Sequence, residues 1–275
     1  MIAGAPPMLE KPFRIMLIAL FCGCGSPVLA QELDPVFARH DAVGTIVIER
    51  RSDQRQWTAN PERAAQRFLP ASTFKIPNSL IILETGVIGD PAGDIIAWDG
   101  VERGGAWDQD QSLRTAFRRS AVWAYQASAR EVGHDRMQRL VSAIGYGNAD
   151  TGPPDAVDLF WLEGPLEISA QEQIAFLGRL YARDLPFRAE VMDGVVEIME
   201  AGRGEGWVLR AKTGWAIRDE PNTGWYVGWL ETEDDVFFFA LNMDLDFTAD
   251  DGRNRIRIAR SALEAVTGLD LSPDD

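Results

Sequence analysis

Strand-like patterns lie near both ends of the chain. Residues 43–50 are rich in β-branched side chains and predict a strand, which pairs with 56–60 across a polar turn. Near the other end three short β-rich runs follow one another, at 207–212, 225–231 and 236–243. Three consecutive acidic residues separate the last two runs, which therefore form a predicted hairpin.

Between these strands the apolar positions repeat with the period of a helix. Residues 128–144 and 169–181 have this pattern, and Ser169 with Glu172 has the spacing of a capping box. A closing helix is predicted at 256–266. This order predicts an α+β fold, in which an antiparallel sheet from both chain ends, flanked by N- and C-terminal helices, carries an inserted all-helical lobe.

Residues 1–30 have the features of a processing segment. Lys11 and Arg14 precede a short apolar run, and small residues end the segment at Ala30. Because the run is too short to span a bilayer comfortably, we expect a signal peptide that is cleaved near Ala30 and exports the chain to the periplasm. An uncleaved anchor is the alternative.

After this segment, residues 31–275 contain no repeat or linker and are predicted to form a single domain. Its sheet lobe covers about 31–65 and 205–275, and its helical lobe about 66–204. Both cysteines, Cys22 and Cys24, precede this domain. The exported domain is therefore expected to contain no disulfide and no cysteine metal site.

Charge and histidine content exclude several classes of function. The chain has 27 basic and 42 acidic residues, a net charge of −15, which disfavours binding to nucleic acid or to an anionic membrane surface. The two histidines, His40 and His134, are far apart and have no companion at metal-ligand spacing. A zinc hydrolase needs two or three such ligands, so no metal is expected.

The sharpest chemical signal is Ser72 followed three residues later by Lys75. The two residues share one helix face, so the amine can reach the hydroxyl. The apolar neighbours Phe74, Ile76 and Leu80 penalise an ammonium ion and lower the pKa of the lysine, which can then act as base toward serine. Alone, this pattern is also typical of a helix-capping serine beside a solvated lysine.

A second signal, Lys212-Thr213-Gly214, falls in the first of the late strands. The lysine can meet a substrate carboxylate, and the glycine leaves room for a close approach of a ligand to the backbone. This triplet is also weak alone. However, its place after the Ser72 motif follows the order of the penicillin-recognising serine enzymes.

Taken together, the motifs resemble those of the class D β-lactamases, the oxacillinases. Five motifs agree in order and spacing: Ser72-x-x-Lys75, Ser120-Ala121-Val122, Tyr146-Gly147-Asn148, Phe160-Trp161-Leu162-Glu163-Gly164 and Lys212-Thr213-Gly214. The resemblance covers nearly the whole mature chain and implies a serine β-lactamase/transpeptidase-like fold that hydrolyses β-lactam antibiotics. The absence of E-x-x-L-N and S-D-N segments disfavours a class A mechanism.

The resemblance implies a role for each residue of the catalytic motifs. Ser72 looks like the acylated nucleophile, and Lys75 resembles the lysine that reacts with carbon dioxide, from bicarbonate, to form a carbamate that acts as general base. No other cofactor is implied. Ser120 resembles the residue that passes a proton to the leaving lactam nitrogen. The indole N–H of Trp161 would hold the carbamate, in a pocket walled by Val122 and Leu162.

Further residues resemble the family's substrate contacts. Lys212 and Thr213 look like contacts to the substrate carboxylate, beside Gly214. The backbone N–H groups of Ser72 and Trp215 would form the oxyanion hole. Tyr146 and Asn148 look mainly structural.

The family also places an arginine near the last helix to pair with the substrate carboxylate. Arg253 and Arg255 both fit this position. Alignment of the apolar positions of the closing helix favours Arg255.

Substrate range and competing functions follow from the same resemblance. The segment 215–224, with Arg218-x-Glu220-Pro221, resembles a subgroup of oxacillinases able to hydrolyse carbapenems. Two alternatives acylate without turnover: a β-lactam sensor domain and a D,D-peptidase. The sensor domains follow several membrane helices, and Trp161 argues against a peptidase. The expected partner is a small β-lactam, with the chain as monomer or homodimer.

Overall fold

The structure, a computed structural model, describes residues 1–2, 4, 33–218, 220–246 and 249–271. Most of the expected signal peptide, with Cys22, Cys24 and the cleavage position, lies outside the described residues. In the part of the chain that is described, no helix is long and apolar enough to cross a bilayer.

A six-stranded antiparallel sheet joins the two ends of the chain, as predicted. Its strand order is β2-β1-β8-β7-β6-β5. The strands are β1 (Gly44–Arg50), β2 (Gln56–Ala59), β5 (Glu200–Gly204), β6 (Trp207–Ala216), β7 (Asn222–Thr232) and β8 (Val236–Leu245). β1 pairs with β8, with Ile46 opposite Leu241, while β7 and β8 form the predicted hairpin.

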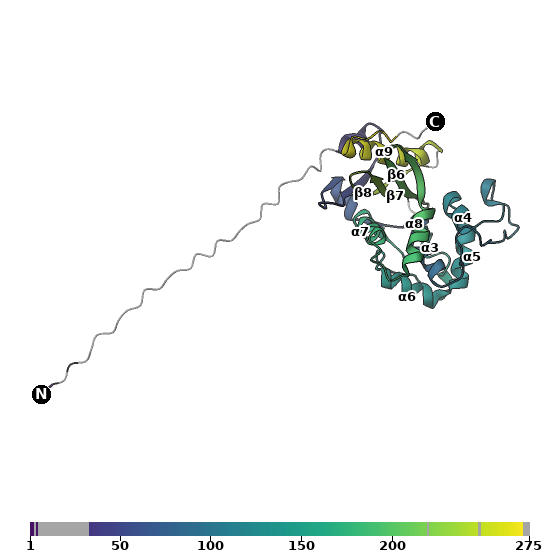
Figure 1. The fold of residues 1–275 in the computed structure, drawn as a ribbon, viewed down its shortest axis with the longest axis horizontal. Coiled ribbons are helices and arrows are strands. Elements are labelled where there is room, and N and C mark those ends of the chain that lie inside the picture. The colour runs from purple at the N-terminus through teal and green to yellow at the C-terminus, as the bar shows by residue number, and fades with distance from the viewer. Residues whose placement is uncertain (3, 5–32, 219, 247–248, 272–275) are drawn as a thin grey trace.

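Helices cover both faces of this sheet (Figure 1). The helices α1 (Asp34–Ala38) and α9 (Ala249–Thr267) share an apolar core with one face, and α9 begins before the predicted 256. On the other face, α7 (Ala170–Tyr181) packs on β8 and β1. Because neither face meets water, β7 has nine consecutive buried residues instead of alternating ones.

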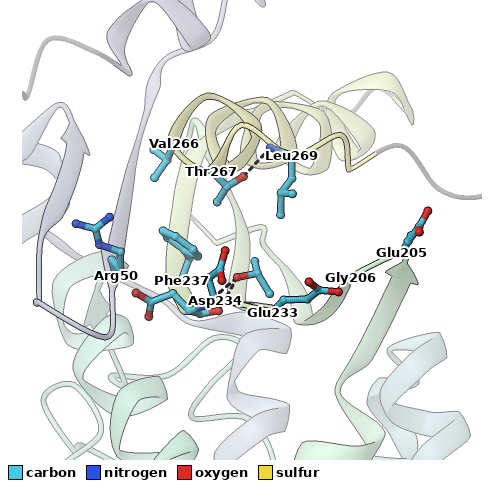
Figure 2. Close-up of a pocket in the computed structure, with 11 residues that line it drawn as sticks. Arg50, Glu205, Gly206, Glu233, Asp234, Phe237, Val266, Thr267 and Leu269 are labelled. Atoms are coloured by element: carbon cyan, nitrogen blue, oxygen red, sulfur yellow. Dashed lines mark hydrogen bonds between the residues drawn. The ribbon is translucent and has the colours of Figure 1, made fainter.

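At one end of the sheet, the β7–β8 turn and the end of α9 border a hollow of about 440 Å³ (Figure 2). Glu205, Glu233 and Asp234 lie around it, and Phe237 forms part of its floor. None of the motif residues of the sequence analysis lines this hollow.

The inserted lobe is helical, as predicted. It holds α3 (Lys75–Glu84), α4 (Leu113–Arg119), α5 (Val122–Val132), α6 (His134–Ile144), α8 (Ala189–Ile198), the turns η2 (Ala71–Phe74), η3 (Gly105–Trp107) and η4 (Pro154–Ala156), and the strand pair β3 (Arg67–Phe68) and β4 (Ile168–Ser169). The short helix α2 (Pro61–Ala65) instead contacts β1, β2 and α7. The single helix expected over 128–144 is wrong. Gly133, with φ 78° and ψ 153°, separates α5 from α6 because that conformation cannot continue a helix. The capping box of Ser169 and Glu172 at the start of α7 is confirmed.

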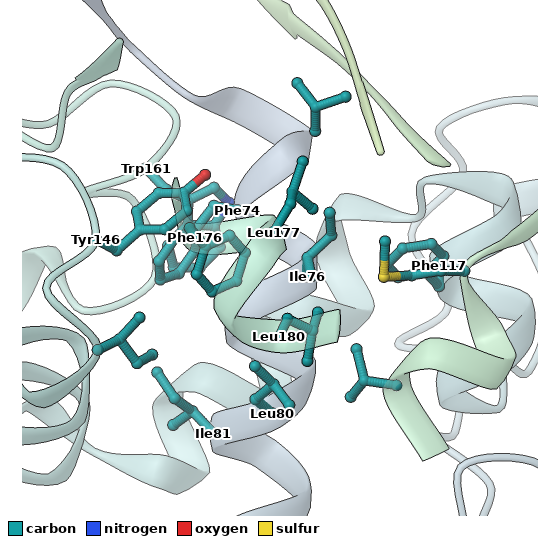
Figure 3. Close-up of a cluster of buried hydrophobic side chains, with 14 of the residues drawn as sticks. Phe74, Ile76, Leu80, Ile81, Phe117, Tyr146, Trp161, Phe176, Leu177 and Leu180 are labelled. Carbon is teal, nitrogen blue, oxygen red and sulfur yellow. The ribbon is translucent and has the colours of Figure 1, made fainter. Parts of the chain in front are cut away.

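The helix α3 runs through the middle of this lobe, in contact with α5, α6 and α8. Every residue from Lys75 to Leu83 is buried. A helix buried on all sides lies at the centre of its lobe. Around its N-terminus the rings of Phe74, Tyr146, Trp161 and Phe176 form an aromatic cluster (Figure 3).

Candidate active site

The amine of Lys75 lies beside the hydroxyl of Ser72. Nζ of Lys75 is 2.8 Å from Oγ of Ser72, within hydrogen-bond reach. Ser72 lies in η2 and is half-buried, whereas Lys75 begins α3 and is fully buried. The pair therefore combines an accessible hydroxyl with an amine that water does not reach.

Burial is the main influence on the charge of Lys75. Removal from water, followed by the nearby cation of Lys212, holds the pKa of Lys75 well below its ordinary value. The ring of Tyr125 lies 5.1 Å from Nζ. No carboxylate forms an ion pair with this amine among the described residues. The neutral amine, a base and a nucleophile, is therefore favoured.

The turn that carries Ser72 is held in an unusual conformation. Ala71, directly before it, has φ 46°, which costs an L-residue free energy and persists only where packing imposes it. The carbonyl of Pro70 accepts hydrogen bonds from the backbone N–H of Thr73 at 3.1 Å and from its hydroxyl at 2.8 Å. The buried amide of Gln173 donates to that hydroxyl at 3.1 Å. These buried hydrogen bonds hold the turn in place.

Strand β6 approaches this turn closely at Gly214. A Cβ at Gly214 would lie 3.0 Å from the carbonyl oxygen of Pro70 and 3.1 Å from Cγ2 of Thr73. The absent side chain thus lets β6 lie against η2, and this contact brings Lys212-Thr213-Gly214 beside Ser72.

Lys212 is the second buried amine of the site. It is 5% exposed, and its Nζ donates to the backbone oxygen of Thr213 at 3.1 Å and to its hydroxyl at 3.3 Å. The ring of Phe117 lies 5.6 Å from Nζ. Burial, followed by the charge of Arg255, lowers the pKa of Lys212 to about 7. The amine is therefore ready to receive an anion, which would stabilise its charged form.

Trp161 lies against Phe74, the residue that directly precedes Lys75. The indole is fully buried and stacks on the phenyl ring, with centroids 5.4 Å apart. Its Nε1–H has no hydrogen-bond partner in the described part of the chain. A buried donor without an acceptor costs about 1–3 kcal/mol. The indole therefore offers a hydrogen-bond donor that the described residues leave unused.

The remaining predicted residues, Ser120, Val122 and Leu162, belong to the helical lobe. Ser120 ends α4 in the left-handed conformation, with φ 59°, and is half-buried. Val122 begins α5 two residues later. Leu162 packs at the edge of the helical core.

Of the two candidate arginines, Arg255 is the one directed into the site. Its guanidinium carbon lies 5.6 Å from the ring centroid of Trp215, and its charge acts on Lys212. Nε and Nη1 of Arg255 are buried and make no hydrogen bond within the described residues. Burial lowers its pKa to about 10. Arg253 is exposed.

Tyr146 and Asn148 hold the segment that carries Trp161. The side chain of Asn148 donates to the carbonyl of Pro165 at 2.7 Å and accepts from the backbone N–H of Glu167 at 3.1 Å. The Tyr146 hydroxyl accepts from Gln173 at 2.9 Å. These contacts tie the loop after α6 to the loop after Trp161.

Sequence reasoning missed several residues that line the site. Tyr125, Phe117 and Gln173 contact Lys75, Lys212 or the turn of Ser72, but they belong to no motif. Asn78 lies three residues after Lys75, is fully buried, and leaves both amide atoms without a partner among the residues described. Only its spacing from Lys75, on the same face of α3, could have indicated it.

Comparisons with known proteins identify the family of this chain. The penicillin binding protein transpeptidase domain family matches residues 36–264. The β-lactamase OXA-2 of Salmonella typhimurium is 45% identical over 265 residues, 95% of this chain and 94% of that protein. The β-lactamase OXA-48 of Klebsiella pneumoniae is 42% identical over 228 residues, 80% of this chain and 85% of that protein.

Two solved structures have the same fold. The class D β-lactamase YbXI from Nostoc is 46% identical, with a TM-score of 0.83 over 86% of this chain and 98% of that one. FUS-1 (OXA-85) of Fusobacterium nucleatum, also a class D β-lactamase, is 36% identical, with a TM-score of 0.84 over 88% of this chain and 100% of that one.

Proposed function

The chain belongs to the class D β-lactamases and is a serine β-lactamase, and on that premise we propose which of its residues perform the reaction. Ser72 is the nucleophile, and Lys75, carrying a carbamate, is the general base. The observation that supports both assignments is the 2.8 Å contact between Ser72 Oγ and a fully buried Lys75 Nζ.

In acylation, Ser72 Oγ bonds to the lactam carbonyl carbon while its proton passes to the base at Lys75. The carbonyl oxygen becomes an oxyanion, which the backbone N–H groups of Ser72 and Trp215 stabilise. The lactam C–N bond then breaks, and Ser120 gives its hydroxyl proton to the nitrogen. The base at Lys75 returns the proton taken from Ser72 to Ser120, which restores both groups. Hydrolysis of the ester by water releases the product and restores Ser72.

The residues around Lys75 fit a carbamate. The depressed pKa favours the unprotonated amine, which reaction with carbon dioxide requires, and the unpartnered Nε1–H of Trp161 matches an added anionic oxygen. When bound, this group supplies a carboxylate-like base able to activate the deacylating water. Val122 and Leu162 keep bulk water from that pocket.

The substrate carboxylate binds to Lys212, Thr213 and Arg255. Lys212 and Arg255 are close enough for the charge of one to depress the pKa of the other. An anion between them removes this repulsion, and the free nitrogens of Arg255 offer it charge-assisted hydrogen bonds.

Carbapenems are among the substrates we propose. In the loop that joins β6 to β7, Nη1 of Arg218 donates to the carbonyl of Gly164 at 2.6 Å. This bond links the loop to the segment that follows Trp161, so the loop is held at one wall of the site. Measurable turnover of imipenem would support this substrate class, and turnover of penicillins with none of imipenem would exclude it.

We also propose that the enzyme is exported after cleavage near Ala30. The motif of an apolar run with a basic flank supports this assignment. N-terminal sequencing of protein from the periplasmic fraction tests it. An unprocessed N-terminus beginning at Met1 would overturn it.

The central experiment measures turnover of a chromogenic cephalosporin by residues 31–275 after acidic pre-incubation, with and without bicarbonate. We expect many turnovers and a higher rate with bicarbonate. A single stoichiometric burst would indicate a sensor or peptidase instead. Turnover unaffected by bicarbonate would exclude the carbamate.

A further inference from the structure

A groove of about 610 Å³ continues from Lys212 and Thr213 along the edge of β6. Residues of α4, of the junction between α8 and β5, and of α9 line it. Its charged lining residues are Arg114, Arg118, Glu197, Glu200, Lys212 and Arg260. Apart from Lys212, none of them takes part in the reaction proposed above.

Both carboxylates of this groove are already paired. Glu197 accepts from Nη2 of Arg114 at 2.6 Å, and Glu200 accepts from Nη2 of Arg203 at 2.6 Å. These pairs cancel the negative charge of the lining. The remaining cations of the groove therefore have no carboxylate partner in the lining.

Three cations remain: Arg118, Lys212 and Arg260. Arg118 is exposed, and its side chain makes none of the side-chain hydrogen bonds or ion pairs found among the described residues. Arg260 donates to the backbone oxygen of Leu271 at 3.1 Å, but its Nε is buried and has no partner within the described residues. The chain as a whole has a net charge of −15, so these residues make the groove a basic region on an acidic protein.

The groove extends from the site on the side where the substrate carboxylate is proposed to bind. The proposed oxyanion hole is at Trp215, and the carboxylate contacts are two and three residues earlier on β6, at Thr213 and Lys212. The groove continues in that direction to Ala211. A substituent on the ring carbon next to the one that bears the carboxylate therefore extends into the groove, away from Ser72.

We propose that this groove is a subsite for a second anionic group, carried by β-lactams on the carboxylate side of the ring system. The proposal rests on the proposed function, since the orientation along β6 follows from it. Arg118 and Arg260 are the residues that recognise this group, and Lys212 is shared with the first carboxylate. β-Lactams with two negative charges at that end are preferred over their neutral counterparts.

The test uses two cephalosporins that differ only in the substituent at C3: a carboxyvinyl group and its carbamoylvinyl isostere, neither of which is expelled. The measured quantity is the ratio of kcat/KM for the acid to kcat/KM for the amide. In Arg118→Glu this ratio is expected to fall about three- to tenfold, because KM for the acid rises. The effect is modest because an exposed cation contributes little to the binding free energy. Arg260→Gln should lower it in the same direction.

Arg139→Glu is the matched control, because it makes the same change in charge at an exposed position on α6, in the helical lobe. It should leave the ratio as in the unaltered enzyme. An equal fall in both charge reversals would mean a general field effect and would overturn the subsite. A ratio unchanged in both Arg118→Glu and Arg260→Gln would also overturn it. Failure of the unaltered enzyme to turn over either cephalosporin would refute the proposed function instead.

Discussion

The indole of Trp161 lies nearly parallel to the ring of Phe74, with centroids 5.4 Å apart and planes at 25°. Phe74 directly precedes Lys75, and its ring also meets Phe160 and Tyr146 edge to face. Packing against these rings therefore fixes the position of the indole, and the N–H group takes no part in that packing.

Trp161→Phe should separate these two contributions. The substitution keeps an aromatic ring on Phe74 and removes the Nε1–H donor together with part of the buried ring volume, a loss that the control below shares. Because a hydrogen bond to a charged group contributes about 1.5–3 kcal/mol, we expect kcat to fall about 10- to 100-fold. Added bicarbonate should partly restore it, as measured in steady-state assays over a range of bicarbonate concentrations.

Trp229→Phe is the control for this substitution. Trp229 is equally buried, and its substitution also removes an indole hydrogen bond, to Glu231 at 2.8 Å. Trp229 lies on β7 and has no role in the proposed reaction. The activity of Trp229→Phe should depend on bicarbonate no more strongly than the activity of the unaltered enzyme does. If Trp161→Phe behaves in the same way, the carbamate does not depend on the indole N–H.

The pKa of Lys212 makes a prediction about stability. Its pKa falls from an ordinary 10.5 to about 7 on folding, so between these values the unfolded chain binds more protons and stability rises with pH. The cost of burying the charged amine, roughly 3–5 kcal/mol, is complete below pH 7 and vanishes toward pH 10.5. Lys212→Met removes this cost.

This cost can be measured by urea unfolding. The unaltered enzyme and Lys212→Met are compared at several pH values between 6 and 9.5. The advantage of the variant in free energy of unfolding should be largest at the acidic end and shrink as pH rises. A difference that stays constant with pH would contradict the depressed pKa.

Arg255 and Arg253 should differ in their effect on substrate binding. Arg255→Ala removes the half-buried guanidinium beside Lys212, so KM should rise about tenfold with little change in kcat. Arg253→Ala, at an exposed position, should leave KM near that of the unaltered enzyme. The opposite result would assign the carboxylate contact to Arg253.

Arg218 should affect carbapenems more than penicillins. Arg218→Ala removes the bond to the Gly164 carbonyl and the 3.3 Å contact with Glu167, which hold the β6–β7 loop against the Trp161 segment. We expect the ratio of kcat/KM for imipenem to that for a penicillin to fall about three- to tenfold. Ile217→Ala, a neighbouring exposed position, is the control. Equal losses for both substrates would refute a role in selectivity.

Gly147 and Gly86 should differ in their tolerance of a methyl group. Both have positive φ, 57° and 71°, so alanine costs about 1–2 kcal/mol in backbone strain at either position. At Gly147 the Cβ would also collide with the carbonyl of Glu167, whereas at Gly86 it meets open space. Thermal unfolding should therefore show a markedly larger loss of stability for Gly147→Ala, and equal losses would contradict the close packing of this loop.

Much of the fold follows from local patterns in the sequence. The strands β1, β7 and β8 and the cap of α7 were predicted because burial on a sheet and capping of a helix depend on residues that are near neighbours in the chain. The approach of Lys75 to Ser72 was predictable for the same reason, since three residues of helical backbone bring the two side chains together. The break at Gly133 was missed because apolar positions on both sides keep the period of one helix.

The rest of the site was decided by tertiary structure. The motifs that contain Trp161 and Lys212 lie far along the chain from Ser72, and only the contact of β6 with η2 and the stacking on Phe74 bring them to it. The choice of Arg255 over Arg253 likewise depends on which side of α9 faces Trp215. The sequence by itself determined which reactive groups the chain carries. Their distances and charges depend on burial and on cations from distant segments, which exist only after the chain has packed.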